Sequence, residues 1–344
     1  MQNFNLHTHS VYSDGKSQPR EIVEEAIRQG LTTLGFSEHS PLPFDNNFSV
    51  KSADMPRYVA EIAQLKEEFK DKIDIYCALE ADYLTGVSEP FAVTKEKHHL
   101  DYLIGGVHLV INPAPELVPE PAVPEAHRRV EGREGPTLAE QIWFIDGPKW
   151  EVYDEGLQKF FNGDIRRAVR RFFDQSNEMI ENEQFDIIAH FDKIKMHNRD
   201  RYFHEDEPWY RKLAMETLDL IREKGLVMEI NTRGIYKKRY NGFYPSPWLM
   251  EEACKMGVPA IISADAHHFS EITLEFAAAE EALKKAGYRS VANFKDGQWV
   301  EVPLSLKISV KTTGFRVFCY FCRKISNYGC IDNVLWNYYF HVLF

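Results

Sequence analysis

Histidine and carboxylate side chains stand at the downstream ends of several short apolar runs in this 344-residue chain. His7 and His9 follow the run 4–6, and Asp265 and His267 follow the run 258–264. The other members of the set end their own runs or lie in the polar loop 10–15; they are Asp14, His39, Glu80, His108 and His190. Nitrogen and oxygen donors without thiolates suit Zn, Mn or Fe in catalytic rather than structural sites. The set therefore indicates a metal centre that performs chemistry.

The spacing within the set indicates more than one metal ion. In His7-Thr8-His9 and Asp265-Ala266-His267 two donors stand two residues apart, so on a regular strand both point to the same face. Nine donors are too many for one ion, so we expect two or three ions with Glu80 as the bridging carboxylate. Closely spaced divalent ions lower the pKa of a bound water from about 16 toward about 7 and hold the oxygens of a displacement. Hydrolysis is therefore the leading reaction class.

The remaining histidines are expected outside this centre. His268 follows His267 directly and would point elsewhere, which favours a structural role. For six others, in expected loops or on expected helix surfaces, we favour a solvated or capping role: His98, His99, His127, His197, His204 and His341.

An alternation of strand-like and helical segments positions the donors. Apolar runs end near residues 7, 37, 80, 107, 189, 230 and 264, which predicts seven strands. Amphipathic patterns between them predict helices over 20–29, 55–69, 165–181, 208–224, 247–255 and 274–285. Alternation of this kind implies parallel βα units, whose strands in a barrel end at one face. Because the common barrel has eight strands, we expect a distorted or incomplete seven-stranded α/β barrel.

Two segments depart from this rhythm. Residues 112–136 contain six prolines, which favours a solvated, disordered insertion after the strand that leads to His108. Residues 305–344 carry five Lys or Arg, the single acid Asp332 and ten aromatic residues. The net charge of −11 thus divides into −15 for residues 1–304 and +4 for 305–344. We predict one enzymatic domain over 1–304, followed by an appended docking tail or a reading-frame artefact.

Composition bounds the partners of this chain. A net charge of −11 disfavours a nucleic-acid binder that works by neutralising phosphates. Residues 331–344 are too few and too polar to cross a membrane. The start of the chain leads straight into the first strand, so no signal peptide is expected. The five cysteines form no disulfide framework, and Cys319 and Cys322 have no second pair that would complete a zinc site. These features favour a cytoplasmic enzyme.

Several of these segments together resemble the PHP (polymerase and histidinol phosphatase) family, over residues 1–304 and in the same order. The donor segments that carry the resemblance are His-Thr-His-Ser at 7–10 with Asp14-Gly15, Ser-Glu-His-Ser-Pro-Leu-Pro at 37–43, Leu-Glu-Ala-Asp-Tyr at 79–83, Gly-Val-His at 106–108, Ala-His-Phe-Asp at 189–192 and Ser-Ala-Asp-Ala-His at 263–267. The histidinol-phosphatases of the family are indicated by residues 39–43, Trp-Phe-Ile-Asp-Gly at 143–147, Asp-Lys-Ile-Lys at 192–195 and Tyr-Pro-Ser-Pro at 244–247.

The resemblance implies a distorted seven-stranded TIM-like (β/α)7 barrel with a trinuclear centre. One ion would be held by His7, His9, Glu80 and Asp265, a second by Glu80, His108 and His190, and a third by Asp14, His39 and His267. The implied substrate is L-histidinol phosphate, which is cleaved to L-histidinol and phosphate in histidine biosynthesis. The implied mechanism is in-line attack of a metal-bridging hydroxide, with Glu80, Asp265, His267 and Arg233 as catalytic residues.

Cationic side chains are expected to complete a phosphate clamp, as phosphoryl transfer requires. Arg233 is the first candidate because it lies nearest a strand end. Further candidates are Lys237, Lys238 and Arg239 after the same strand, and Arg166, Arg167, Arg170 and Arg171 on one helix, where a solvated basic face fits equally well. Glu38, Asp82 and Tyr83 are candidates for contact with the imidazole or amine of the substrate.

Two other functions are compatible with the sequence. The chain could be another PHP phosphoesterase that acts on nucleotides, nucleic-acid ends or phosphotyrosine, although the net charge weakens the nucleic-acid version. It could also be a non-catalytic metal-binding scaffold that docks partners through its aromatic tail, an alternative that the complete set of donors disfavours.

Overall fold

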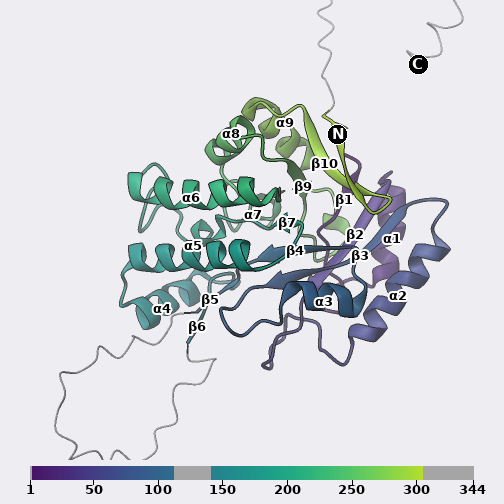
Figure 1. The fold of residues 1–344 in the computed structure, drawn as a ribbon, viewed down its shortest axis with the longest axis horizontal. Coiled ribbons are helices and arrows are strands. Elements are labelled where there is room, and N and C mark those ends of the chain that lie inside the picture. Colours follow the sequence, from purple (N-terminus) through teal and green to yellow (C-terminus); the bar gives the residue numbers. More distant parts are fainter. Residues whose placement is uncertain (1, 112–140, 305–344) are drawn as a thin grey trace, which may run out of the picture. The chain divides into compact units, whose positions relative to one another are not determined.

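The computed structural model describes residues 2–111 and 141–304, and its centre is a parallel sheet of seven strands (Figure 1). In sheet order the strands are β1 (Phe4–Asn5), β2 (Thr33–His39), β3 (Asp74–Asp82), β4 (Tyr102–Gly106), β7 (Ile187–Ile188), β8 (Val227–Asn231) and β9 (Ala260–Ser263). A parallel bridge between Thr8 and Ala266 joins the chain beyond β1 to the chain beyond β9. The sheet is therefore a nearly closed barrel, and the predicted distorted seven-stranded barrel is confirmed.

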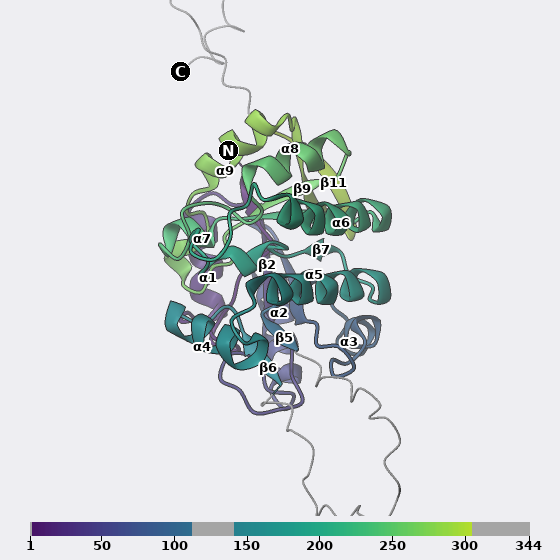
Figure 2. The ribbon, with the colours of Figure 1, turned by 90° about the vertical axis from the view of Figure 1, so that its left-hand side faces the viewer.

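Helices cover the outside of the sheet, as Figures 1 and 2 show from two directions. They are α1 (Pro19–Arg28), α2 (Met55–Glu68), α3 (Phe91–His98), α4 (Trp150–Phe161), α5 (Ile165–Asn182), α6 (Pro208–Lys224), α7 (Arg233–Tyr236), α8 (Pro247–Lys255) and α9 (Phe276–Ala286). The pattern in α5 shows why such segments fold as helices. Asp164 caps its first turn by accepting from the backbone N–H of Arg167, and Val169, Phe172 and Met179 lie on its buried face.

Three helices, α3, α4 and the single-turn α7, and two hairpins were not predicted from the sequence. Helix α3 buries only Phe91 and Thr94, so it has little amphipathic pattern. Helix α4 contains Gly156, where an added Cβ would meet the Trp143 ring at 2.0 Å, so packing selects a residue that disfavours helices. The hairpins are β5 (Leu109–Ile111) with β6 (Ile142–Phe144), and β10 (Ser290–Lys295) with β11 (Gln298–Pro303).

Some predictions fall beyond the part of the chain that the structure describes. The Pro-rich insertion at 112–136 and the tail at 305–344 lie outside the described residues. The domain division at residue 304 stays a prediction. Within residues 2–111 and 141–304, the helices are all too short or too polar to cross a membrane.

Inside the barrel, the Tyr102 side chain of β4 packs closely against the backbone of β2 and of the segment that follows β1. The Tyr102 hydroxyl donates to the carbonyl oxygen of Leu6 and lies against Gly35 of β2. A Cβ at residue 35 would meet that hydroxyl oxygen at 1.8 Å and the Leu6 Cα at 3.1 Å. Glycine is therefore required here by space.

We expect Gly35→Ala to destabilise the protein, because the added methyl must displace a hydrogen-bonded tyrosine from a packed core. Overpacking of this kind lowers the free energy of unfolding by on the order of 1–3 kcal/mol. Gly147→Ala is the control, since its Cβ would meet Val152 at an ordinary 3.5 Å. Urea unfolding of both variants measures the difference, and equal losses would contradict the packing argument.

Candidate metal centre

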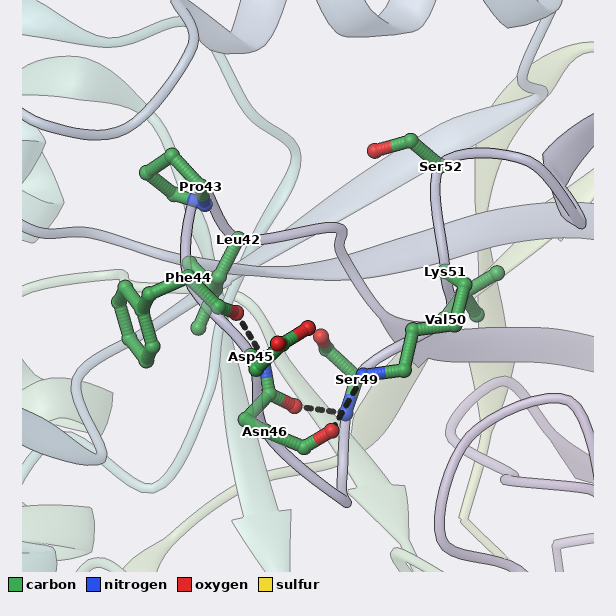
Figure 3. A pocket seen from close by; sticks show the side chains of 9 residues that line it. All are labelled: Leu42, Pro43, Phe44, Asp45, Asn46, Ser49, Val50, Lys51 and Ser52. Atoms are coloured by element: carbon green, nitrogen blue, oxygen red, sulfur yellow. Dashed lines mark hydrogen bonds between the residues drawn. The ribbon is translucent and has the colours of Figure 1, made fainter.

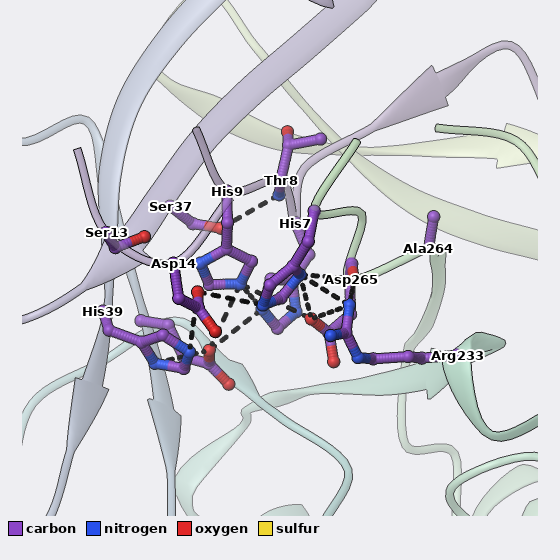
Figure 4. A network of polar contacts seen from close by, with 12 residues as sticks. His7, Thr8, His9, Ser13, Asp14, Ser37, His39, Arg233, Ala264 and Asp265 are labelled. Atoms are coloured by element: carbon purple, nitrogen blue, oxygen red, sulfur yellow. Dashed lines mark hydrogen bonds and ion pairs between the residues drawn. The ribbon is translucent and has the colours of Figure 1, made fainter. Parts of the chain in front are cut away.

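Strand register brings the predicted donors to one end of the barrel. His39 and Glu80 are direct partners across β2 and β3. The bridge between Thr8 and Ala266 sets the pair His7 and His9 beside the pair at 265 and 267, and the His9 amide donates to the Ala266 carbonyl at 2.8 Å. Figure 4 shows His7, His9, Asp14, His39 and Asp265 converging from separate segments of the chain. The ends of parallel strands thus bring together donors that are about 260 residues apart in sequence.

Glu80 stands between two groups of histidines. Its Oε2 lies 3.2 Å from His7 Nε2 and 3.5 Å from His9 Nε2. Its Oε1 lies 3.0 Å from His190 Nε2 and 3.5 Å from His108 Nε2. The carboxylate therefore has the geometry of a bridge between two ion sites.

A third group lies nearer the solvent. Asp14 Oδ1 is 3.0 Å from His267 Nε2 and 3.8 Å from His39 Nε2. His9 can join this group, and it also lies beside Asp265, whose Oδ1 is 3.5 Å from His9 Nε2. His39 Nδ1 faces Glu80 Oε2 at 3.2 Å, so the third group is continuous with the bridge.

Carboxylates behind the imidazoles fix their orientation. His7 Nδ1 is hydrogen-bonded to Glu229, and His108 Nδ1 lies 2.7 Å from Asp82 Oδ1. Each Nδ1 therefore holds the proton, which leaves the Nε2 lone pair directed into the centre. These lone pairs meet those of neighbours, with His7 Nε2 3.1 Å from His9 Nε2 and His108 Nε2 3.1 Å from His190 Nε2. Converging lone pairs repel one another unless a cation lies among them.

The fit to metal ions is supported by buried oxygens that face the centre. Among the described residues, Glu80 Oε2 and Asp14 Oδ1 are buried and receive no hydrogen bond. Buried anionic oxygens require a positive partner. Together with the imidazole nitrogens they make a donor set that fits a multinuclear divalent-metal site.

Electrostatics favour the metal-binding protonation state at Glu80, Asp265 and His9, whereas neighbouring carboxylates outweigh burial and raise the pKa of His7 and His39. Burial would raise the pKa of Glu80, but His7, His108 and His39 hold it well below its usual value. Burial would also raise the pKa of Asp265, but the positive charge of Arg233 and the nearby His7 hold it well below its usual value. Burial, His267 and His39 lower the pKa of His9, so its imidazole is neutral. Ionised carboxylates beside a neutral imidazole are ready to bind a cation.

A cavity of about 250 Å³ opens beside the donors, and cations line one of its sides. The Arg233 guanidinium donates to the Asp265 carbonyl at 2.6 Å and is only 8% exposed. Lys193 Nζ lies 2.7 Å from Asp146 Oδ2, and Arg239 Nη1 lies 3.4 Å from Asp146 Oδ1. Asp146 therefore holds two cations at the cavity beside Arg233.

Lys193 and Asp146 had no assigned role in the sequence analysis. Lys193 comes three residues after His190 and begins the 3-10 turn Lys193–Lys195, which turns its side chain back toward the strand end. Asp146 follows hairpin β5–β6, which was not predicted. The only signal in the sequence was their place in the resemblance segments 143–147 and 192–195.

The other candidate cations lie away from the cavity. Arg166 and Arg170 are on the exposed face of α5, where Arg166 pairs with Glu207 at 3.4 Å. Lys237 pairs with Glu271, whose other oxygen accepts from the His267 amide at 3.1 Å. The structure thus brings Arg233 and Arg239 to the cavity and places Lys237 behind His267.

Three acids and aromatics that were candidates for substrate contact have other partners. Glu38 is buried and accepts from the Ser10 amide at 2.9 Å and from the Ser10 and Ser13 hydroxyls, which shapes the loop before Asp14. Asp82 supports His108, and the Tyr83 ring packs edge-on against Phe91. None of these three side chains lines the cavity beside the donors, so the structure does not support the expectation that they contact the substrate there.

The expectation for His197 was also wrong. It is 3% exposed, and its Nε2 lies 2.7 Å from the Gly147 carbonyl oxygen. The turn after His190 folds this segment back under the loop that carries Asp146, so the imidazole is buried rather than solvated. His99 and His204 are exposed, as the sequence indicated, whereas His127 and His341 lie outside the described residues.

Known proteins share both the sequence pattern and the fold. The PHP domain family matches residues 5–233. A Deinococcus radiodurans protein named "Probable histidinol-phosphatase" is 26% identical over 289 residues, which cover 83% of this chain and 94% of that protein. The histidinol-phosphatase of Bacillus subtilis is 24% identical over 283 residues, covering 79% and 96%. A crystal structure of histidinol phosphate phosphatase from Lactococcus lactis, complexed with Zn, L-histidinol and phosphate, has a TM-score of 0.58 and 23% identity over 86% of this chain and 98% of that one.

We expect His267→Ala to remove one metal equivalent, because it deletes a nitrogen that faces Asp14 in the outermost group. His268→Ala is the matched control, since the neighbouring side chain points to Ser270 on the surface. Elemental analysis of the purified variants gives the metal content, and thermal unfolding shows whether both remain folded. Equal metal content in the two variants would contradict a ligand role for His267.

Proposed function

The chain belongs to the PHP domain family, and from that premise we propose that it hydrolyses L-histidinol phosphate to L-histidinol and phosphate. The observation that carries the proposal is the convergence of three histidine and carboxylate groups around Glu80, beside a cavity lined by cations. Relatives that cover most of the chain support it, since the Deinococcus radiodurans protein is named a probable histidinol-phosphatase and the Bacillus subtilis protein a histidinol-phosphatase. The Lactococcus lactis structure adds support because it binds L-histidinol and phosphate.

Two or three divalent ions, Zn, Mn or Fe, would be held by the nine donors. His7, His9, Glu80 and Asp265 would form the first site, Glu80, His108 and His190 the second, and Asp14, His39 and His267 the third. When bound, such ions make a water acidic and neutralise phosphoryl oxygens, which is the chemistry that phosphomonoester hydrolysis needs.

The cationic side of the cavity would bind the phosphoryl group. The Arg233 guanidinium is held by the Asp265 carbonyl, so its position is set before substrate arrives. Burial would lower the pKa of Lys193, but Asp146 and Asp265 raise it, so the ammonium stays charged. Asp146 offsets part of the positive charge and fixes Lys193 against Arg239. In-line displacement needs this kind of fixed charge around the equatorial oxygens.

The proposal is tested by phosphate release from L-histidinol phosphate, with and without a chelator. We expect turnover that is lost on chelation and restored by Zn or Mn, because the donor set requires metal. A nucleotide monophosphate and phosphotyrosine are the comparison substrates. A clear preference for either would replace the proposed substrate, and metal content without any phosphomonoesterase activity would favour a scaffold.

Within the cavity, we expect Arg233→Ala and Lys193→Ala each to reduce kcat/KM by roughly 10²–10³, as loss of a fixed charge on a developing anion does. Arg170→Ala is the matched control, because its side chain lies on the exposed face of α5. The metal content of each variant is measured as well, because a lower kcat/KM at normal metal content indicates loss of phosphate binding rather than loss of metal. A normal kcat/KM in both cavity variants would move the phosphate clamp elsewhere.

A further inference from the structure

The cavity beside the metal centre has an aromatic wall as well as a cationic side. Phe48 and Phe144 both line it, with ring centroids 5.7 Å apart and planes at 12°. At this separation the rings are offset, so each leaves part of its face uncovered. Both side chains are half-buried, and the edge of the stack meets His39, whose ring is perpendicular to Phe48 at 5.7 Å. The wall therefore adjoins the third donor group.

A built loop holds Phe48 in place. The Asn46 Oδ1 accepts from the backbone amides of Phe48 at 3.1 Å and Ser49 at 2.8 Å, and its Nδ2 donates to the Phe44 carbonyl at 3.1 Å. Figure 3 shows Asn46 inside the turn formed by residues 42–52. The Val50 amide donates to the His39 carbonyl at 3.0 Å, which fixes the end of the loop to the strand that carries His39.

The second half of the wall comes from a different part of the chain. Phe144 ends β6 and pairs in register with Leu109 of β5. Leu109 belongs to a small apolar cluster with Leu84 and Ile111, against which Phe44, Phe48 and Phe144 pack. This cluster is separate from the barrel core, so the wall is supported by side chains that have no part in the metal centre.

We propose that Phe48 and Phe144 select phosphomonoesters whose leaving group carries a flat aromatic ring, and that Asn46 positions Phe48 for this contact. The inference rests on the proposed function and specifies its substrate class. A phosphoryl group held by Arg233 and Lys193 would leave the remainder of the cavity, which Phe48 and Phe144 line, to the leaving group. The leaving group must then lie within a space of about 250 Å³ whose uncharged surface is largely aromatic. A planar ring gains contact with partly uncovered ring faces, which an alkyl chain does not.

The test compares L-histidinol phosphate with L-alaninol phosphate, which keeps the amino alcohol and lacks the ring. We expect Phe48→Ala and Phe144→Ala to lower kcat/KM for L-histidinol phosphate about tenfold, mainly through KM, and to leave L-alaninol phosphate within about twofold. Phe44→Ala is the control, because Phe44 packs in the same apolar cluster outside the cavity. Equal losses for both substrates in the two cavity variants, or the same selective loss in Phe44→Ala, would overturn the inference.

Two substitutions of Asn46 test its positioning role. Asn46→Ala removes the acceptor of two amides and should reproduce the KM increase for L-histidinol phosphate, with kcat little changed. Asn46→Asp keeps the oxygen that accepts from both amides but loses the donor to the Phe44 carbonyl, so it should bring KM most of the way back to the wild-type value. A structural role alone would not distinguish the ring-bearing from the ringless ester, so loss on both substrates would contradict positioning.

Failure of the proposed function remains distinguishable from failure of this inference. If the wild-type enzyme cleaved neither amino-alcohol ester, the proposed function would be wrong. Benzyl phosphate and ethyl phosphate would then decide the inference, because ring selection does not need the amine. A wild-type preference for benzyl phosphate that Phe48→Ala abolishes would support it, whereas equal rates on the two esters, or no turnover of either, would overturn it.

Discussion

The fully buried carboxylate of Glu80 is the constraint on which the rest of the site depends. A charge in this position is tolerated only with positive partners, and the imidazole nitrogens on both sides of it are placed to hold such cations beside it. Those imidazoles come from β1, β2, β4 and β7 or from the residues that follow them, so their meeting requires the sheet to curl. The curled sheet is therefore what allows the Glu80 carboxylate to be buried among imidazoles from several strands.

Behind the donors lies a second set of carboxylates that connects the groups. Glu229 in the middle of β8 bonds His7 Nδ1 through one oxygen and accepts from the His190 amide at 2.9 Å through the other. Asp82 supports His108 and also faces His39 Nδ1 at 3.6 Å. Each of these acids contacts members of two groups, so the relative placement of the groups is set by hydrogen bonds to the protein itself. Such partners commonly fix the orientation and basicity of metal-binding histidines.

Sequence reasoning predicted the parts of this arrangement that follow from strand ends. The end of a buried apolar run is visible in the sequence, and parallel strands place such ends together, which is why His39, Glu80 and His190 could be identified. Glu229 was not found, because it lies inside a strand and only burial distinguishes it from a solvated acid. Lys193 and Asp146 depend on a short turn and on a hairpin whose strands are 30 residues apart, and neither has a periodic pattern. The direction of Glu38 could not be inferred either, since the contacts of its carboxylate with Ser10 and Ser13 are tertiary.

The bridge between Thr8 and Ala266 has a consequence for biosynthesis. Donors near the beginning of the chain have their partners at residues 265–267, so the centre stays open while the intervening 250 or so residues emerge from the ribosome. Contacts between residues so far apart in sequence form late, and they reduce the rate of folding. Capture of metal by the proposed centre would therefore be tied to completion of the barrel, and a nascent chain that stalls before β9 would expose an unfinished cluster of imidazoles to whichever transition metal is most available.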